Sequence, residues 1–191
     1  MKKEIKFLTV PGWTNSGPQH WQSLWEQEHP EYVRVEQKDW IRPVIADWVE
    51  GLRSAIEKAG CPVVLIGHST GCIAIVHYAH QHKQDVRGAF LVAPSDVERD
   101  DFPPSLVGFA PIPMKSLPFA SLVVASSTDP YTTLQRARQF ADGWGSKIVE
   151  VGALGHINTA SGHGPWPEGQ KLLAEFTENV SSWKRFIPGG L

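Results

Sequence analysis

Residues 63–76 read Val-Val-Leu-Ile-Gly-His-Ser-Thr-Gly-Cys-Ile-Ala-Ile-Val. An apolar strand, a Gly-x-Ser-x-Gly turn and a helix in direct succession are typical of a nucleophile elbow, in which a serine occupies a strained turn. Gly67 and Gly71 leave room for that turn, because a side chain at either position would strike the neighbouring strand or helix. Ser69 would then lie at a helix N-terminus, whose free N–H groups favour a developing oxyanion. A plain strand–helix turn with a capping serine is the alternative.

The length and charge of the chain narrow its class. With 191 residues it can bury one sizeable core, and we expect a single domain spanning 1–191. Its 18 basic and 20 acidic residues leave a net charge of −2 without a basic stripe, which argues against a nucleic-acid partner. No apolar run approaches the ~20 residues of a membrane span, so we expect no membrane association. The N-terminal apolar stretch, interrupted at Lys6 and ended by Pro11, is a poor signal peptide, and the cytoplasm is the expected compartment.

Strand-like and helical patterns alternate along the chain. The apolar segments read as strands buried on both faces, as a parallel sheet covered by helices requires. We expect strands at 5–10, 32–36, 63–66, 86–92, 121–126 and 147–151, and helices beginning near Pro18 and Ile45 and spanning about 70–82, 131–142 and 169–185. Six prolines between Pro94 and Pro118 predict an irregular loop. The predicted fold is α/β, with a doubly wound, mostly parallel sheet of about six strands and helices on both faces.

Ligands of such sheets bind beyond the carboxyl ends of the strands. Ser69, Asp129 and His156 each follow a different expected strand, in the order Ser…Asp…His that is typical of α/β-hydrolases. His156 would take the proton of the Ser69 hydroxyl, and Asp129 would orient the imidazole and stabilise its charged form. The backbone N–H groups of Thr70 and of Trp13, in the loop after the first strand, would form the oxyanion hole.

Other readings of these residues stay open at this point. Asp129 precedes Pro130 and could be only the N-cap of the following helix. Asp96, after the strand at 86–92, is the competing acid, and His163 is the fallback base. No carboxylate or cysteine cluster accompanies the histidines near residue 80, so we expect no metal and no cofactor.

With these residues in place, the chain resembles the small YdeN-like serine hydrolases, a family that includes the vertebrate retinoblastoma-binding serine hydrolase. The resemblance covers about residues 5–180. Its motifs are Pro-Gly-Trp at 11–13, Gly-His-Ser-Thr-Gly at 67–71, Leu-Val-Ala-Pro at 91–94, Pro-Ile-Pro at 111–113, Ser-Ser-Thr-Asp-Pro-Tyr at 126–131 and Gly-His-Ile-Asn at 155–158. It implies a compact α/β-hydrolase fold without a separate lid domain, a Ser69–Asp129–His156 triad, and hydrolysis of an ester or amide. Partner binding by the vertebrate member is not carried over, because the chain has no Leu-x-Cys-x-Glu motif.

The expected activity is carboxylesterase-like cleavage of a small ester through an acyl-enzyme intermediate. Amide or peptide hydrolysis by the same triad, and an idle binding protein on the same scaffold, are the alternatives. The segment 94–118 is the one stretch long enough to cover the site, which favours small or exposed acyl groups. Candidates for the substrate pocket, for each of which core packing is equally open, are Trp13, Phe102, Phe109, Ile112 and Trp166. His68, beside Ser69, is a further candidate, as a packing or pocket residue. We expect a monomer or a small homo-oligomer.

Overall fold

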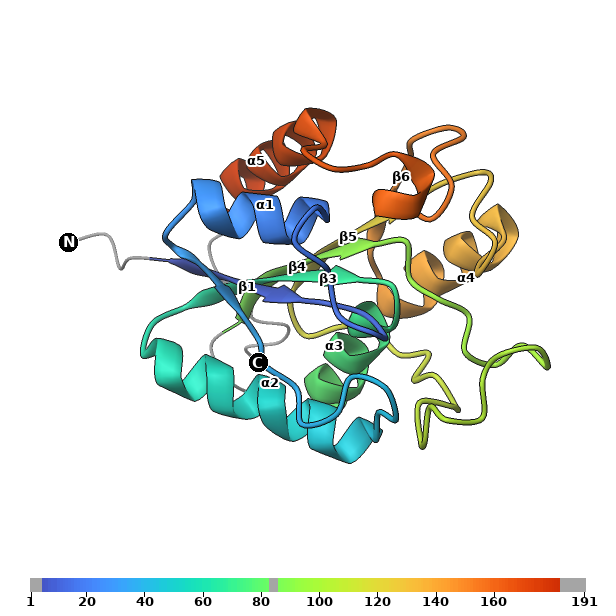
Figure 1. Ribbon diagram of the computed structural model, residues 1–191. Helices are drawn as coiled ribbons and strands as arrows, with labels where there is room; N and C mark the ends of the chain where they lie inside the picture. Colours follow the sequence, from blue (N-terminus) through green and yellow to red (C-terminus); the bar gives the residue numbers. More distant parts are fainter. Residues whose placement is uncertain (1–4, 83–85, 183–191) are drawn as a thin grey trace, which may run out of the picture.

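The computed structural model describes residues 5–82 and 86–182, and the described residues contain one six-stranded sheet (Figure 1). The strands are β1 (Lys6–Val10), β2 (Tyr32–Arg34), β3 (Val63–His68), β4 (Val86–Val92), β5 (Ala120–Ala125) and β6 (Lys147–Glu150). Their order is β2-β1-β3-β4-β5-β6, and every neighbouring pair is parallel. The predicted doubly wound parallel sheet is therefore confirmed.

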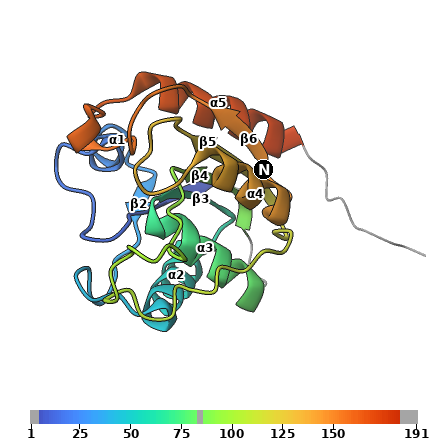
Figure 2. The same ribbon diagram turned by 90° about the vertical axis from the view of Figure 1, so that its right-hand side faces the viewer.

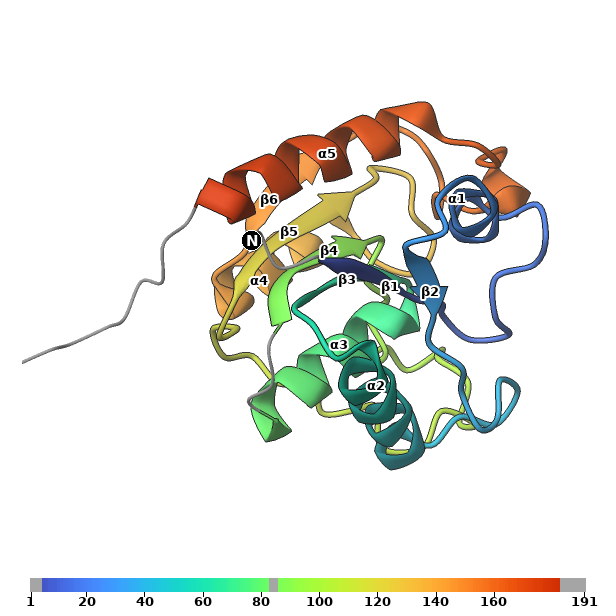
Figure 3. The same cartoon turned by 90° about the vertical axis from the view of Figure 1, so that its left-hand side faces the viewer.

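Helices cover both faces of this sheet, as predicted. They are α1 (Trp21–Glu28), α2 (Ile45–Ala59), α3 (Thr70–Gln81), α4 (Leu134–Trp144) and α5 (Pro167–Ser182), with a short 3₁₀ helix η1 (Thr159–Ser161) before α5. Helices α1 and α5 lie on one face, while α2, α3 and α4 lie on the other (Figures 1 and 3). None of the helices in the described part of the chain is long and apolar enough to span a membrane.

Each face of the sheet has its own apolar core because successive strand side chains point to opposite sides. In β3, Val63 and Leu65 pack on the side of α2, α3 and α4, whereas Val64 and Ile66 pack on the side of α1 and α5. All four side chains are buried. A strand covered on both faces needs apolar residues at every position, which explains why residues 63–66 read as a continuous apolar run.

The segment before α4 differs from the expected helix at 131–142. The helix begins at Leu134, and Thr133 is its N-cap, accepting the N–H of Arg136. Asp129 is therefore not the N-cap; its carboxylate accepts the N–H of Tyr131 in a local turn. Pro130 favours an extended backbone at the residue before it, which keeps 129–132 out of the helix.

Smaller differences occur at the other helices. The first helix begins at Trp21 rather than near Pro18, with His20 as its N-cap. The last helix begins at Pro167, where the missing N–H of a first-turn proline costs nothing. Of its expected range, residues 183–185 lie outside the described residues.

The proline-rich segment 94–118 contains no helix or strand, as predicted, but it is firmly bound to its surroundings (Figure 2, yellow-green). Val107 exchanges backbone hydrogen bonds with the start of α2, through Pro43 and Ile45. His77 on α3 contacts the carbonyl of Phe109, and Trp144 on α4 donates to the carbonyl of Pro113. These bonds hold the segment against the three helices of one face.

Candidate active site

Ser69 lies between β3 and α3 with φ 57° and ψ −128°, a backbone conformation that non-glycine residues rarely adopt. Close packing around the turn holds this strained conformation. A Cβ atom at Gly71 would lie 2.2 Å from the carbonyl oxygen of Val10, and one at Gly67 would lie 2.8 Å from Cδ1 of Ile75. The two glycines are thus needed for the steric reason anticipated from the sequence, and the turn has the geometry of a nucleophile elbow.

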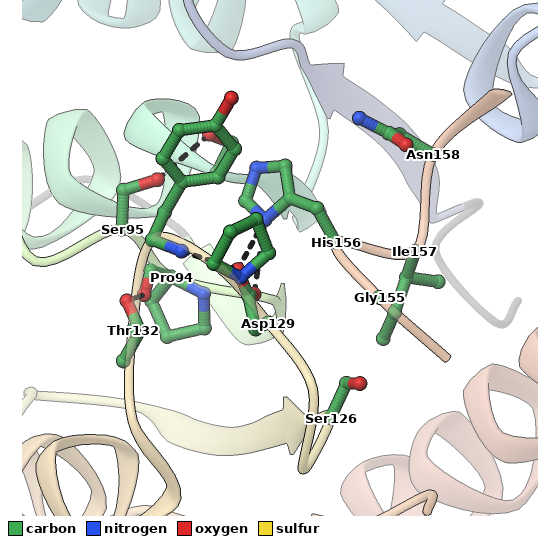
Figure 4. A network of polar contacts seen from close by, with 12 residues as sticks. Pro94, Ser95, Ser126, Asp129, Thr132, Gly155, His156, Ile157 and Asn158 are labelled. Carbon is green, nitrogen blue, oxygen red and sulfur yellow. Dashed lines mark hydrogen bonds and ion pairs between the residues drawn. The ribbon is translucent and has the colours of Figure 1, made fainter. Parts of the chain in front are cut away.

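His156 and Asp129 form a tight pair in the turns that follow β6 and β5 (Figure 4). Nδ1 of His156 lies 2.9 Å from both carboxylate oxygens, and the two side chains are only 7% and 3% exposed. A carboxylate only accepts hydrogen bonds, so Nδ1 carries the proton and Nε2 is left as an acceptor. Thr128 supports the pair, because its hydroxyl accepts the N–H of Gly155 at 3.0 Å and joins the two turns.

Ser69 and His156 line one cavity of about 240 Å³. The hydroxyl of Ser69 lies 2.9 Å from that of Ser95, and within the described residues it makes no hydrogen bond to the imidazole of His156. Hydrogen bonds of catalytic groups are often long or absent in ligand-free enzymes and form when substrate binds. The cavity is lined by Gly12, Trp13, Thr14, Asn15, His20, His68, Ser69, Thr70, Ser95, Phe102, Tyr131, His156 and Asn158.

The two expected oxyanion donors border this cavity in different states. The N–H of Trp13 donates to the hydroxyl of Thr70 at 2.7 Å. The N–H of Thr70, at the first residue of α3, has no acceptor among the described residues. In this structure one of the two N–H groups is therefore unpaired, and the other is bonded to the Thr70 hydroxyl.

Arg34 on β2 anchors the loop that carries Trp13. Its guanidinium donates to the carbonyl oxygen of Ser16 at 2.9 Å and to the side-chain oxygen of Asn15 at 3.1 Å. Glu26 on α1 pairs with the same guanidinium at 2.9 Å, and both side chains are less than one-fifth exposed. The arginine fork thus joins β2, α1 and the loop in one arrangement.

Three of the six pocket candidates line the cavity, namely Trp13, His68 and Phe102. The other three lie in the core, so this arrangement corrects their assignment. Phe109 is fully buried and packs on Trp48, with ring centroids 5.4 Å apart, and Ile112 belongs to the same cluster. Trp166 stacks on Trp25 across the opposite core. The segments that carry these three residues pack against helices and not at the edge of the sheet. The sequence pattern alone does not indicate this packing.

The competing acid and base lie elsewhere. The carboxylate of Asp96 is 3.2 Å from Nε of Arg136, whereas Asp129 holds His156. His163 lines a separate cavity beside β6 and α5, together with Trp166. Within residues 5–82 and 86–182, no group of three or more histidine, cysteine or acidic side chains could hold a metal ion.

Ser95, Tyr131 and His20 are among the cavity residues to which sequence reasoning gave no role. Ser95 is 1% exposed. It comes soon after the end of β4, and this position in the sequence was the signal that it lies at the carboxyl edge of the sheet. The Tyr131 ring meets the His156 ring edge-to-face, with centroids 4.5 Å apart. Residue 131 follows the Asp-Pro pair closely, but nothing in the pattern near residue 20 indicates proximity to Ser69.

Two further histidines beside His156 are held neutral by burial. Desolvation lowers the pKa of His20 to about 3, and the nearby Arg34 and His156 act in the same direction. Desolvation also lowers the pKa of His68 well below its usual value, with His156 and His20 adding to the effect. Both imidazoles are therefore uncharged at neutral pH.

The sheet order, the helices on both faces and the strained serine between β3 and α3 define an α/β-hydrolase fold. The sequence matches the family model described as serine hydrolase over residues 7–175, and the chain belongs to this family. The protein is therefore a hydrolase enzyme, and the resemblance stated from its motifs is confirmed.

Solved structures agree with this assignment. A protein described as a YdeN-like hydrolase, from Pectobacterium atrosepticum, is 36% identical with a TM-score of 0.83, over 93% of this chain and 92% of that one. The ydeN gene product of B. subtilis is 18% identical with a TM-score of 0.72, over 93% and 100%. Est1E from Butyrivibrio proteoclasticus, solved with ferulic acid bound, is 12% identical with a TM-score of 0.73, over 95% and 92%; these last two show the fold alone. No curated protein matches the sequence.

Proposed function

We propose that this protein, a single α/β-hydrolase domain, hydrolyses the ester bond of a small substrate through an acyl-enzyme formed on Ser69. The observation that carries the proposal is the His156–Asp129 pair, with both carboxylate oxygens 2.9 Å from Nδ1, in the same cavity as a strained serine. A buried carboxylate on Nδ1 leaves Nε2 free to accept a proton. The cavity of about 240 Å³ favours a small acyl group.

In the first half of the reaction, the Ser69 hydroxyl leaves Ser95 and gives its proton to Nε2 of His156, while its oxygen attacks the ester carbonyl. The N–H groups of Thr70 and Trp13 stabilise the resulting oxyanion. When the tetrahedral intermediate collapses, the C–O bond to the alcohol breaks, and His156 protonates the departing oxygen. Asp129 stabilises the imidazolium throughout this half-reaction.

The second half repeats these steps with water as the nucleophile. His156 takes a proton from the water, and the hydroxide oxygen attacks the acyl carbonyl. Collapse of the second intermediate releases the carboxylic acid, and the proton returns from His156 to Ser69. An amide would follow the same route, with an amine in place of the alcohol.

Labelling with a fluorophosphonate tests whether Ser69 is an activated nucleophile. We expect the wild type to be labelled and Ser69→Ala not to be. Ser127→Ala, which alters an exposed serine, is the matched control and should label like the wild type. Labelling that persists in Ser69→Ala, or its absence from the folded wild type, would contradict the proposal and favour a binding protein.

Substrate panels then separate esters from amides. We expect p-nitrophenyl esters with acyl chains of two to eight carbons to be cleaved with a higher kcat/KM than p-nitroanilides carrying the same acyl groups. His156→Ala should abolish turnover of both while the circular dichroism spectrum is unchanged. A higher kcat/KM for the anilides would favour amide hydrolysis over ester hydrolysis as the activity of this protein.

A further inference from the structure

His20 has an unpaired hydrogen-bond donor at the wall of the active-site cavity. The residue is the N-cap of α1, and its Nδ1 accepts the N–H of Gln22 at 3.2 Å. A neutral imidazole carries one proton, so that proton lies on Nε2. Nε2 is buried and has no partner among the described residues, although His20 is only 6% exposed and borders the cavity.

A buried N–H without an acceptor lowers the stability of the fold, and such groups are rare enough in native proteins to need an explanation. Protonation does not relieve this one, because burial already disfavours the charged imidazole. A ligand oxygen within the cavity would complete the pairing of Nε2.

His68 supplies the complementary group beside it. The two rings lie with centroids 4.8 Å apart. His68 Nε2 lies 2.9 Å from the carbonyl oxygen of His156, which only accepts, so Nε2 carries the proton and Nδ1 is an acceptor. No partner of this Nδ1 occurs in the described part of the chain, and His68 also lines the cavity. Neighbouring histidines thus offer one donor and one acceptor.

We propose that His20 and His68 form a recognition site for a hydroxyl group carried by the ester substrate, an inference that rests on the proposed function. A hydroxyl oxygen accepts from Nε2 of His20, and its proton is donated to Nδ1 of His68. A single small group therefore satisfies both atoms.

Other substituents fit the pair less well. An alkyl group leaves the His20 donor unpaired. A carboxylate cannot donate to His68, and Arg34, whose charge acts on His20, is already paired with Glu26. The site therefore selects hydroxylated esters over alkyl esters, since a buried polar group discriminates strongly against an analogue that lacks its partner.

Matched pairs of esters test the selection. For the acyl side, p-nitrophenyl butyrate is compared with the p-nitrophenyl esters of 2-hydroxybutyrate and 3-hydroxybutyrate. For the alcohol side, ethyl butyrate is compared with 2-hydroxyethyl butyrate by titrating the released acid. In at least one arm we expect the wild type to favour the hydroxylated member by about tenfold or more in kcat/KM.

Two substitutions separate recognition from helix capping. His20→Asn keeps an acceptor near the position of Nδ1 for the cap and removes the Nε2 donor, whereas His20→Gln removes the cap acceptor and keeps an amide donor near Nε2. We expect His20→Asn to reduce the selectivity ratio to within about twofold of unity and His20→Gln to retain part of it. His29→Asn, at the exposed C-terminal end of the same helix, should keep the wild-type ratio.

A binding measurement keeps this proposal separate from the proposed function. In Ser69→Ala, the uncleaved hydroxylated ester should bind about tenfold tighter than its alkyl partner, and adding His20→Asn should remove the difference. If the wild type cleaves no ester but this binding pattern holds, the proposed function fails and the recognition site stands. Equal binding of the two esters, or a wild-type preference that survives His20→Asn, overturns the recognition site.

Discussion

The two walls of the active-site cavity differ in how completely their polar atoms are paired. On the wall built by the turns after β5 and β6, His156 Nδ1 bonds Asp129, and Asp129 also accepts the N–H of Tyr131. On the wall built by the loop after β1 and the start of α1, which we call the unpaired wall, Nε2 of His20 has no partner in the described residues. The first wall thus orients His156 through a paired Nδ1 without a ligand, whereas the second wall leaves a buried donor without an acceptor.

From this difference we expect the two walls to have different functions, catalysis for the paired wall and substrate selection for the unpaired wall. Charge stabilisation is effective when the groups around the reacting atoms are oriented in advance, and the paired wall has that property. Substrate selection requires polar atoms whose pairing is completed by the correct ligand, and the unpaired wall offers them. The substitutions below test the two walls separately.

The largest expected effect is on the paired wall. Asp129→Asn should lower kcat by about 10⁴-fold, because an amide no longer stabilises the imidazolium or holds the same tautomer. Steady-state assays with a p-nitrophenyl ester measure the loss. Asp96→Asn, which alters a carboxylate paired with Arg136, is the control and should stay within about fivefold of wild type. A fully active Asp129→Asn together with an inactive Asp96→Asn would reverse the assignment of the acid.

The next effect concerns the close approach of the loop after β1 to Ser69. A Cβ at Gly12 would lie 2.7 Å from Cβ of Ser69 and 3.2 Å from its hydroxyl, so Gly12→Ala should displace either the serine or the loop. We expect kcat/KM to fall about 100-fold, the size of effect seen when reacting groups are misplaced by about 1 Å. Gly17→Ala in the same loop meets no atom within 4 Å and should have little effect. Equal kcat/KM values for Gly12→Ala and Gly17→Ala would contradict this expectation and show that the loop accommodates the added methyl group without displacing Ser69.

A smaller effect should follow from loosening the anchor of the unpaired wall. Arg34→Lys keeps the charge but loses the fork that joins Ser16, Asn15 and Glu26. We expect kcat to fall about tenfold as Trp13 loses its fixed position, measured together with the rate of fluorophosphonate labelling.

Arg138→Lys is the matched control for this substitution. Arg138 makes a similar two-pronged contact with Glu150 on the surface, away from the loop. Arg138→Lys should leave kcat and the rate of fluorophosphonate labelling near their wild-type values. Equal losses in Arg34→Lys and Arg138→Lys would show that the contacts of Arg34 with the loop after β1 have no particular importance for activity.

The smallest effect is on stability and depends on pH. Below about pH 6.5 the unfolded chain binds a proton at His20, whereas the folded protein does so only near pH 3, so unfolding takes up a proton and stability falls as pH falls. For His20 alone this amounts to about 2 kcal/mol between pH 7 and pH 5. Urea unfolding at the two pH values should therefore show a smaller loss for His20→Asn than for the wild type. An unchanged loss, as expected for His29→Asn, would mean that His20 is not buried in solution.

Much of the candidate active site was accessible to pattern reasoning because Ser69 and the members of the paired wall all follow strands. Ser69 follows β3 within a recognisable motif, and Asp129 and His156 come soon after β5 and β6. Parallel strands bring their carboxyl ends to one edge, so position in the chain was enough to place these residues together. The unpaired wall carried no comparable signal, because His20 precedes a helix and reaches the cavity only through the packing of α1 on the sheet.

The order and spacing of the apolar residues were sufficient to predict the parallel sheet and its covering helices, because strands and helices follow from local periodicity. The glycines around Ser69 were sufficient to predict the serine turn, because only residues without a side chain fit there. Which polar atoms find partners depended on the folded arrangement. Ser69 contacts Ser95 across 26 positions of the chain, and Trp21 donates to the carbonyl of Ile157 across 136. Such contacts follow from how helices and loops pack in three dimensions, and for the same physical reason Phe109 and Trp166 fill cores while His20 lines the same cavity as Ser69.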